Sequence, residues 1–151
     1  GFKRAFSEMG LEMPPLMGSS ETNFQSLQSA VSLTMLGKKQ FERNTDRCEF
    51  YVIGEPIVGN DVIENPHKIA QLNEVYEGLI NGFIQAIWPT GSKGVGAEIT
   101  RFTGECYTAD VNLTDSAGPS CAVLAAVKKE HEETFLHSMT APVNKLIKVK
   151  E

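Results

Sequence analysis

The chain has 151 residues, of which 41% are hydrophobic and 22% are charged, and its formal net charge is −5 at pH 7. These values predict a globular chain with a sizeable core. Acidic and basic residues are interspersed, which argues against nucleic acid or an anionic membrane as the main partner. No apolar run approaches the roughly 18 residues of a membrane span, and the first residues lack the apolar stretch of a signal peptide.

The chain contains three cysteines, Cys48, Cys106 and Cys121, and no C-x-x-C pair. An odd number of cysteines without paired spacing predicts neither a disulfide framework nor a structural zinc site. Free thiols are typical of a reducing compartment, so the expected location is the cytoplasm.

In chain order, the first expected element is the end of a helix over residues 2–9, which a Pro-Pro pair and a glycine separate from the next helix. Thr22, with Gln25 three residues later, has the pattern of a capping box. It predicts a helix over residues 23–41, whose apolar positions repeat about every 3.6 residues. These positions are Phe24, Leu27, Val31, Met35 and Leu36.

A β-rich run, CEFYVI, comes next at residues 48–53, and IVGNDVI at residues 57–63 predicts a second short strand or an extended arm. Asn65 and Pro66 then have the pattern of a helix start, a capping residue before proline at the first helical position. The apolar periodicity continues to Trp88, and Pro89 ends the expected helix.

Two glycines, Gly78 and Gly82, lie one turn apart on that expected helix, although glycine in a helix interior costs about 1 kcal/mol against alanine. Their shared face has no side chains at two levels, so it predicts that another backbone can approach closely. Three interpretations stay open: tight packing of the helix on the sheet, a seam between two subunits, and a ligand channel.

Residues 95–103 and 106–113 predict the two strands of a hairpin that turns at Gly104 and Glu105. Apolar and polar residues alternate in the second strand, which predicts one buried and one exposed face. The expected buried residues are Tyr107, Ala109, Val111 and Leu113, and the expected exposed residues are Thr108, Asp110 and Asn112.

Pro119 opens a predicted last helix over residues 120–138, and residues 143–149 predict a short edge strand. The expected order is therefore helix, two strands, helix, two strands, helix. This order predicts a single α+β domain over residues 1–151, with an antiparallel sheet packed against helices. The last helix, from about residue 119, forms a C-terminal extension of that domain.

The stretch from about residue 26 to residue 113 resembles the V4R (4-vinyl reductase) and TRAPP-subunit superfamily. The matching pieces are a helix, an extended arm, a glycine-bearing helix and a hairpin, in the order LQSAVSLTMLG, CEFYVIGEPIVGNDVI, YEGLINGFIQAI and VGAEITRFTGECYTADVNL. The resemblance implies homodimers formed through helices and a hydrophobic interior slot, which suits a small apolar or partly polar ligand. No cofactor is expected.

Three features depart from the pattern of that superfamily, and one of them is the extra helix expected after Pro119. Many bacterial V4R domains carry a cysteine pair around the hairpin, whereas this chain has only Cys106 there. The acylated cysteine of one TRAPP subunit class has no counterpart in MGSSETNF. The expected function is a ligand-binding or dimeric assembly domain, and the candidate ligand-binding residues are Gly78, Gly82, Phe83 and Tyr107.

The alternative function is a small cysteine-dependent enzyme, a hydrolase or a lyase. Cys121 falls in the first turn of the expected last helix, and a helix N-terminus lowers the pKa of a thiol. Cys106 begins an expected strand, and His131 is the candidate base. The plainer interpretation takes both thiols as inert and His131 as a residue at the edge of the core.

The segment EHEETFLH invites a metal site, because Glu130, Glu133 and His137 share one face of the expected last helix. Carboxylate and histidine sets of this kind bind metals in helical bundles. One helix alone supplies too few ligands, and no matching set occurs on another expected helix. We therefore expect a solvated charged face and no metal site.

Overall fold

The computed structural model describes residues 1–20, 25, 27–28, 31–42 and 44–149, and its contacts divide the chain into two units, Gly1–Phe41 and Glu42–Glu151. The first unit contains the helix α1, Phe2–Glu8, where the end of a helix was expected. Among the described residues, no helix is long and apolar enough to cross a membrane.

The helix expected over residues 23–41 is not formed in the part of this segment that the structure describes. Residues 31–41 have irregular backbone, and the side chains of Val31, Met35 and Leu36 are exposed. Phe24 lies outside the described residues. An amphipathic helix gains most of its stability by packing its apolar face, and isolated helices are marginal in water. The periodicity therefore did not suffice to fix a helix here.

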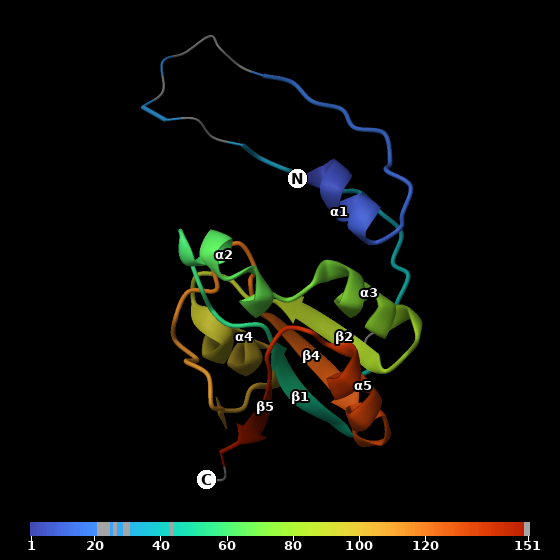
Figure 1. Cartoon of the computed structure of the whole chain (residues 1–151), viewed down its shortest axis with the longest axis vertical. Coiled ribbons are helices and arrows are strands. Elements are labelled where there is room, and N and C mark those ends of the chain that lie inside the picture. The colour runs from blue at the N-terminus through green and yellow to red at the C-terminus, as the bar shows by residue number, and fades with distance from the viewer. Residues whose placement is uncertain (21–24, 26, 29–30, 43, 150–151) are drawn as a thin grey trace. The chain divides into compact units, whose positions relative to one another are not determined.

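The second unit is built on one five-stranded sheet in the order β2-β4-β1-β5-β3, in which all neighbouring strands are antiparallel (Figure 1). The strands are β1 (Cys48–Ile53), β2 (Ile84–Pro89), β3 (Tyr107–Thr108), β4 (Val123–Lys128) and β5 (Val143–Lys148). The predicted α+β class with an antiparallel sheet is confirmed. The strand β5 lies between β1 and β3, however, and is not the edge strand that the sequence predicted.

Four α-helices and two 3-10 turns connect these strands. They are α2 (Asp61–Glu64), η1 (Pro66–Lys68), α3 (Leu72–Ile80), α4 (Gly94–Thr103), η2 (Lys129–His131) and α5 (Glu132–Ser138). The series β1-α3-β2-β4-α5-β5, with its strands in the spatial order β2-β4-β1-β5, is the split βαβ arrangement known as ferredoxin-like. The segment with α4 and β3 is inserted between β2 and β4, and β3 extends the sheet beside β5.

The prediction of one helix from Pro66 to Trp88 is wrong. The helix α3 ends at Ile80, and Gly82 in the turn after it has φ +76°, a conformation that glycine adopts without strain. The chain then returns as β2, so Pro89 ends a strand and not a helix. The segment 57–63 was expected to be a strand or an arm, but residues 57–60 are irregular and residues 61–63 belong to α2. A short apolar run has the same pattern in a buried strand and in a helix, and this ambiguity misled the prediction.

The predicted hairpin over residues 95–113 is also wrong. Residues 94–103 form α4, and Gly104 ends this helix at φ +76° with its N–H bonded to the carbonyl of Thr100 at 2.8 Å. The strand β3 has only two residues. The alternation itself is real, since a set of half-buried residues packs against the core while the residues between them are exposed. The half-buried set is Tyr107, Ala109, Val111 and Leu113, and the exposed set is Thr108, Asp110 and Asn112.

The predicted helix over residues 120–138 is correct only for its last seven residues, which form α5. Residues 123–128 form β4, which pairs with β1 on one side and with β2 on the other. Because the core covers both faces of this strand, its first five residues, VLAAV, are all apolar and lack the alternation of a half-buried strand.

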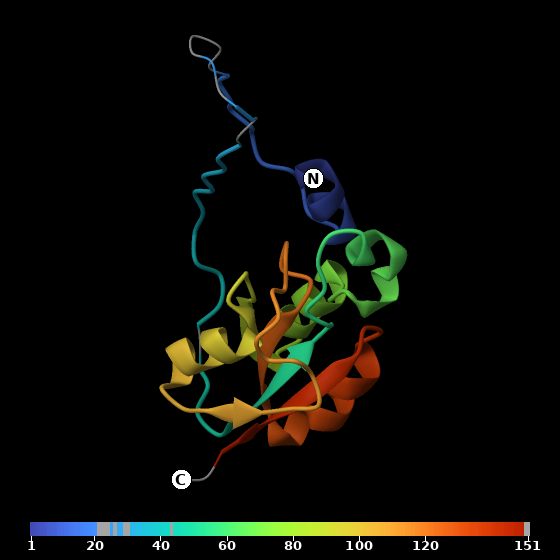
Figure 2. The same ribbon diagram turned by 90° about the vertical axis from the view of Figure 1, so that its left-hand side faces the viewer.

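The sheet has a core on each face. On one face, Val52, Leu124 and Ala126 pack against Val95 and Ile99 of α4. On the other face, strand residues pack against α3 and α5, namely Tyr51, Ile53, Ile84 and Val127 against Val75 and Phe135. Figure 2 shows α4 on one side of the sheet and α5 on the other. We call these the α4 face and the α3/α5 face.

Candidate functional site

The residues before β1 and after β4 lie side by side at one end of the sheet. The two strands are antiparallel and place Cys48 opposite Lys128, so the chain enters β1 where it leaves β4. Between the two segments lies a pocket of about 680 Å³. Its lining residues are Asn44, Asp46, Arg47, Lys128, Lys129 and Glu130. We call it the basic pocket.

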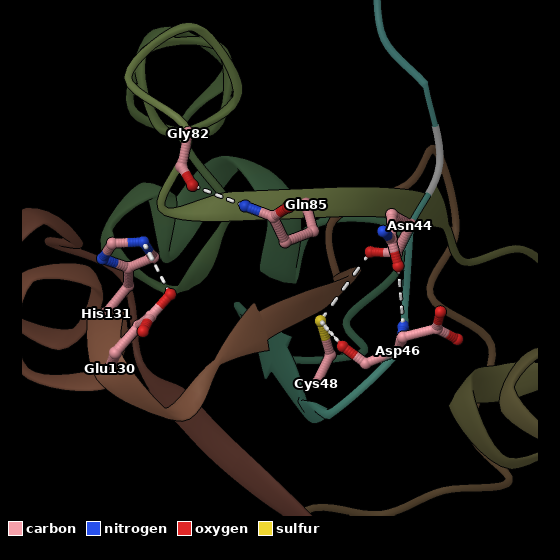
Figure 3. A network of polar contacts seen from close by, with 7 residues as sticks. All are labelled: Asn44, Asp46, Cys48, Gly82, Gln85, Glu130 and His131. Carbon is pink, nitrogen blue, oxygen red and sulfur yellow. Dashed lines mark hydrogen bonds and ion pairs between the residues drawn. The ribbon is translucent and has the colours of Figure 1, made fainter.

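On the β1 side of the basic pocket, residues 44–47 form a tight turn. The Asp46 N–H donates to Oδ1 of Asn44 at 3.0 Å, and the Cys48 N–H donates to the carbonyl of Thr45 at 3.1 Å. Arg47 lies between them with φ +59°. A left-handed conformation costs a residue other than glycine about 1–2 kcal/mol. The hydrogen bonds around it therefore hold an arginine at a position that favours glycine, and Figure 3 shows the bond between Asp46 and Asn44.

The charges around the pocket are positive on balance. Arg47, Lys128 and Lys129 supply three positive charges, whereas Asp46 and Glu130 supply two negative ones, which leaves +1 at a site in a chain of −5. Within the described part of the chain, none of these three cations has an ion pair within 4.0 Å or a side-chain hydrogen bond.

Three other lysines of the second unit, Lys68, Lys145 and Lys148, are paired with carboxylates. Lys68 lies 2.9 Å from Glu55, and Lys148 lies 2.9 Å from Glu105. The cations of the basic pocket therefore keep their donors available, and arginine and lysine donors suit phosphate and carboxylate groups.

His131 comes directly after Glu130 and lies beside it, with Nε2 3.7 Å from the Glu130 carboxylate. On the neighbouring strand β2, the Gln85 side-chain amide donates to the carbonyl of Gly82 at 2.5 Å. Figure 3 shows this end of the sheet, where the residues that enter β1 lie across from Glu130 and His131. The sequence interpretation placed His131 on a long helix, whereas the structure places it on the turn η2.

Cys48 lies between the turn and the sheet, half-buried. Its Sγ lies 3.8 Å from the carbonyl oxygens of both Asn44 and Asp46. Burial raises the pKa of this thiol, and the charge of Lys128 opposes that shift only in part. Cys48 is therefore a thiol that donates weakly to backbone carbonyls, and it forms part of the wall.

The cysteines singled out from the sequence lie elsewhere. Cys121 precedes β4 and is only 1% exposed, and burial raises its pKa. It is therefore not in the first turn of a helix, as was predicted. His131 lies beyond the opposite end of β4, and a six-residue strand spans about 20 Å. Cys106 is exposed and precedes β3, on the edge of the sheet beyond β5. The structure thus does not bring either thiol to His131.

The candidate ligand-binding residues are divided between the two faces. A methyl group on Gly78 would come 2.5 Å from Cδ1 of Ile84 and 3.0 Å from a ring carbon of Phe83. Core side chains of the same chain, and not another backbone as predicted, therefore approach Gly78 closely. At Gly82, no described residue lies within 4 Å of the added methyl. Tyr107 packs on the α4 face, away from Phe83.

Within the described part of the chain, no group of three or more histidine, cysteine, aspartate or glutamate residues is placed to hold a metal ion. Glu130 lies on η2, whereas Glu133 and His137 lie on α5. Nδ1 of His137 lies 2.8 Å from the carbonyl oxygen of Glu133, so the imidazole ring interacts with the backbone of its own helix, α5.

Sequence reasoning missed the basic pocket. Its walls lie about eighty residues apart in the chain, and only the pairing of β1 with β4 brings them together. A weak signal was present, because Lys128 and Lys129 come directly after an uninterrupted apolar run that ends a strand.

No protein-family model, curated protein or solved structure shows a significant match to the chain. The resemblance to the V4R and TRAPP-subunit superfamily therefore stays a prediction.

Proposed function

We propose that this chain is a binding module for a small molecule with a compact anionic group, a phosphate or a carboxylate, which occupies the basic pocket. The observation that carries the proposal is the set of three cations, Arg47, Lys128 and Lys129, which surround a pocket of about 680 Å³ without ion pairs in the described chain. This volume is in the range of small-molecule sites, roughly 300–1,000 Å³.

The two carboxylates of the pocket refine the expected ligand. Asp46 and Glu130 repel anions but accept hydrogen bonds, so they favour a ligand that carries hydroxyl or amine donors beside its anionic group. The proposal keeps the ligand-binding part of the sequence prediction and moves the ligand from the glycine-bearing helix to the end of the sheet. Homodimer formation stays a prediction, which native mass spectrometry tests.

The cysteine-dependent enzyme receives less support. The thiolate is the reactive form of cysteine, and burial raises the pKa of both Cys121 and Cys48. Thiol labelling at neutral pH separates the two functions. A binding module is expected to show three slowly reacting thiols, whereas one fast-reacting cysteine, Cys121 or Cys106, favours the enzyme.

Isothermal titration with inorganic phosphate tests the proposal directly. Each of Lys128→Gln and Lys129→Gln is expected to weaken binding by about two- to fivefold, the effect of one exposed charge. Lys68→Gln removes an equal charge from a lysine already paired with Glu55, and serves as the matched control that leaves the affinity unchanged. Equal losses in all three variants would show a response to net charge alone, and the pocket would then not be the site.

A further inference from the structure

Beside the basic pocket, β5 separates from β1 and pairs with β3, and we call this separation the fork. The strands β1 and β5 pair from Phe50 to Ile53, and the ladder ends at the pair Phe50 and Leu146. Beyond this pair, β5 continues beside β3, with Ile147 opposite Thr108, and leaves the first residues of β1 without a partner on that side. A second pocket of about 320 Å³ opens in this fork. Its lining residues are Cys48, Glu49, Phe50, Tyr107, Lys145, Leu146, Ile147 and Lys148.

The fork offers aromatic and apolar surface. The rings of Phe50 and Tyr107 lie 5.8 Å apart, edge to face, and both residues are only half-buried. Ile147 is 60% exposed in the same pocket. Phe102 of α4 supports Phe50 from the core side, with a ring separation of 6.3 Å. The fork thus presents a preformed aromatic surface that a ring or an alkyl chain can cover.

The two pockets lie within reach of one small molecule. Lys128 is directly opposite Cys48 in the sheet, and residues so paired have Cβ atoms about 5 Å apart. Cys48 and Phe50 are two residues apart on one strand, so they share a face and lie about 7 Å apart. Cys48, Phe50 and Tyr107 all pack against the core of the α4 face. The path from the Lys128 side chain to the Phe50 ring therefore runs past the side chain of Cys48.

We infer that the ligand is amphiphilic: its anionic group binds in the basic pocket, and a ring or short apolar chain attached to it lies on Phe50 and Tyr107 in the fork. The inference rests on the proposed function, because the basic pocket holds the anionic end. It adds a second subsite and names the ligand class, an aryl or alkyl phosphate or carboxylate whose two ends lie about 10 Å apart. Tyr107, which the sequence predicted as a ligand-binding residue, would contact the apolar end of this ligand.

The second subsite is tested with two probes, propyl phosphate and 3-phenylpropyl phosphate, which differ only in the phenyl ring. A ring contact is worth a factor of about three to ten in affinity. The ratio of the two dissociation constants is therefore expected to be about three to ten for the unaltered chain, and about one for Tyr107→Leu. Tyr76→Leu makes the same substitution on α3, which does not line the fork, and is expected to keep the ratio.

The possible outcomes distinguish failure of the second subsite from failure of anion binding in the basic pocket. If both probes bind equally well, the second subsite is wrong and the basic pocket stands. If neither probe binds, the proposed function fails with it. Should Tyr107→Leu not fold, intermolecular nuclear Overhauser effects on the unaltered chain decide instead. Contacts from the phenyl protons to the rings of Phe50 and Tyr107 are expected, and contacts only to other residues would overturn the inference.

Discussion

The two faces of the sheet are closed to different degrees. On the α3/α5 face, Tyr51, Ile53 and Phe135 are at most 1% exposed. On the α4 face, Val95 and Ile99 close the centre as tightly, but Cys48 and Phe50 at the end of β1 stay half-buried. The crossover helices of the split βαβ arrangement thus complete one core, whereas the inserted segment leaves one end of the other face accessible. The candidate site lies at this end.

The side chains of Tyr51, Glu132 and Lys145 form a hydrogen-bonded cluster on the α3/α5 face, which we call the latch. The buried Tyr51 hydroxyl donates to the Glu132 carboxylate at 2.5 Å, and the Lys145 ammonium donates to the same oxygen at 2.9 Å. The latch joins β1, α5 and β5. It also fixes the start of α5 directly after η2, the turn that carries Lys129 and Glu130. The closed face therefore holds one wall of the open site in place.

The largest expected difference between the faces is in core truncation. Phe135→Ala leaves a cavity in the fully buried α3/α5 core and is expected to destabilise the chain by about 3–5 kcal/mol. Phe50→Ala removes the same side chain from the half-buried end of the α4 face, and its expected effect is below about 2 kcal/mol. Urea unfolding measures both. Equal losses would mean that the two faces are closed alike.

Substitution of Gly78 and Gly82 is expected to produce the next largest change in stability. Gly78→Ala places a methyl against Ile84 and Phe83 in the core of the α3/α5 face, and such overpacking costs about 1–3 kcal/mol. Gly82→Ala meets no described neighbour but strains a residue at φ +76°, with an expected cost of about 1 kcal/mol. Asparagine tolerates this conformation, so Gly82→Asn should recover most of the loss while Gly78→Asn should not. Stabilisation by Gly78→Ala would contradict the packing described for α3.

The latch predicts a smaller effect that depends on pH. Tyr51→Phe removes a hydrogen bond to a charged group and is expected to cost about 1.5 kcal/mol at neutral pH. Hydrogen bonds from Tyr51 and Lys145 lower the pKa of Glu132, so the stability they provide is present at neutral pH and is lost as acid protonates this carboxylate.

At alkaline pH, the latch loses its stabilising effect because Tyr51 ionises. Burial, with the hydrogen bond to Glu132, raises the pKa of Tyr51 to about 12. A raised pKa stabilises the folded chain below the ordinary tyrosine value, and this stability is lost as pH rises through about 12. Thermal unfolding across pH should therefore show a gap between Tyr51→Phe and the unaltered chain that narrows at both extremes. A gap that does not change with pH would show that the latch is not electrostatic.

The smallest expected effect concerns Arg47 at the open end. Because this residue has φ +59°, Arg47→Gly should be neutral or should stabilise the chain by up to about 1 kcal/mol. The same change should weaken phosphate binding by about two- to fivefold. Urea unfolding and phosphate titration on one sample measure both. A loss of stability without a loss of affinity would show that Arg47 has a structural role only.

The fold could be predicted from the sequence only where the local signals were unambiguous. The strands β1 and β5 were found because β-branched and aromatic residues lie between turn residues. The strands β2 and β4 are short apolar runs next to real helices, and periodicity cannot distinguish a buried strand from a helix in such runs. The site was beyond sequence reasoning for a different reason. Arg47 and Lys128 become neighbours only through the register that places Cys48 opposite Lys128.

The central claim is that the open end of the sheet binds anions. Amide chemical shifts of the isotope-labelled chain during a phosphate titration test it most directly, because they locate the ligand without any substitution. We expect the shifts to concentrate at Arg47, Cys48, Lys129 and Glu130, with Val75 and Phe135 of the closed face unaffected. No saturable shift at millimolar phosphate, or shifts centred on α3 and α5, would contradict the account.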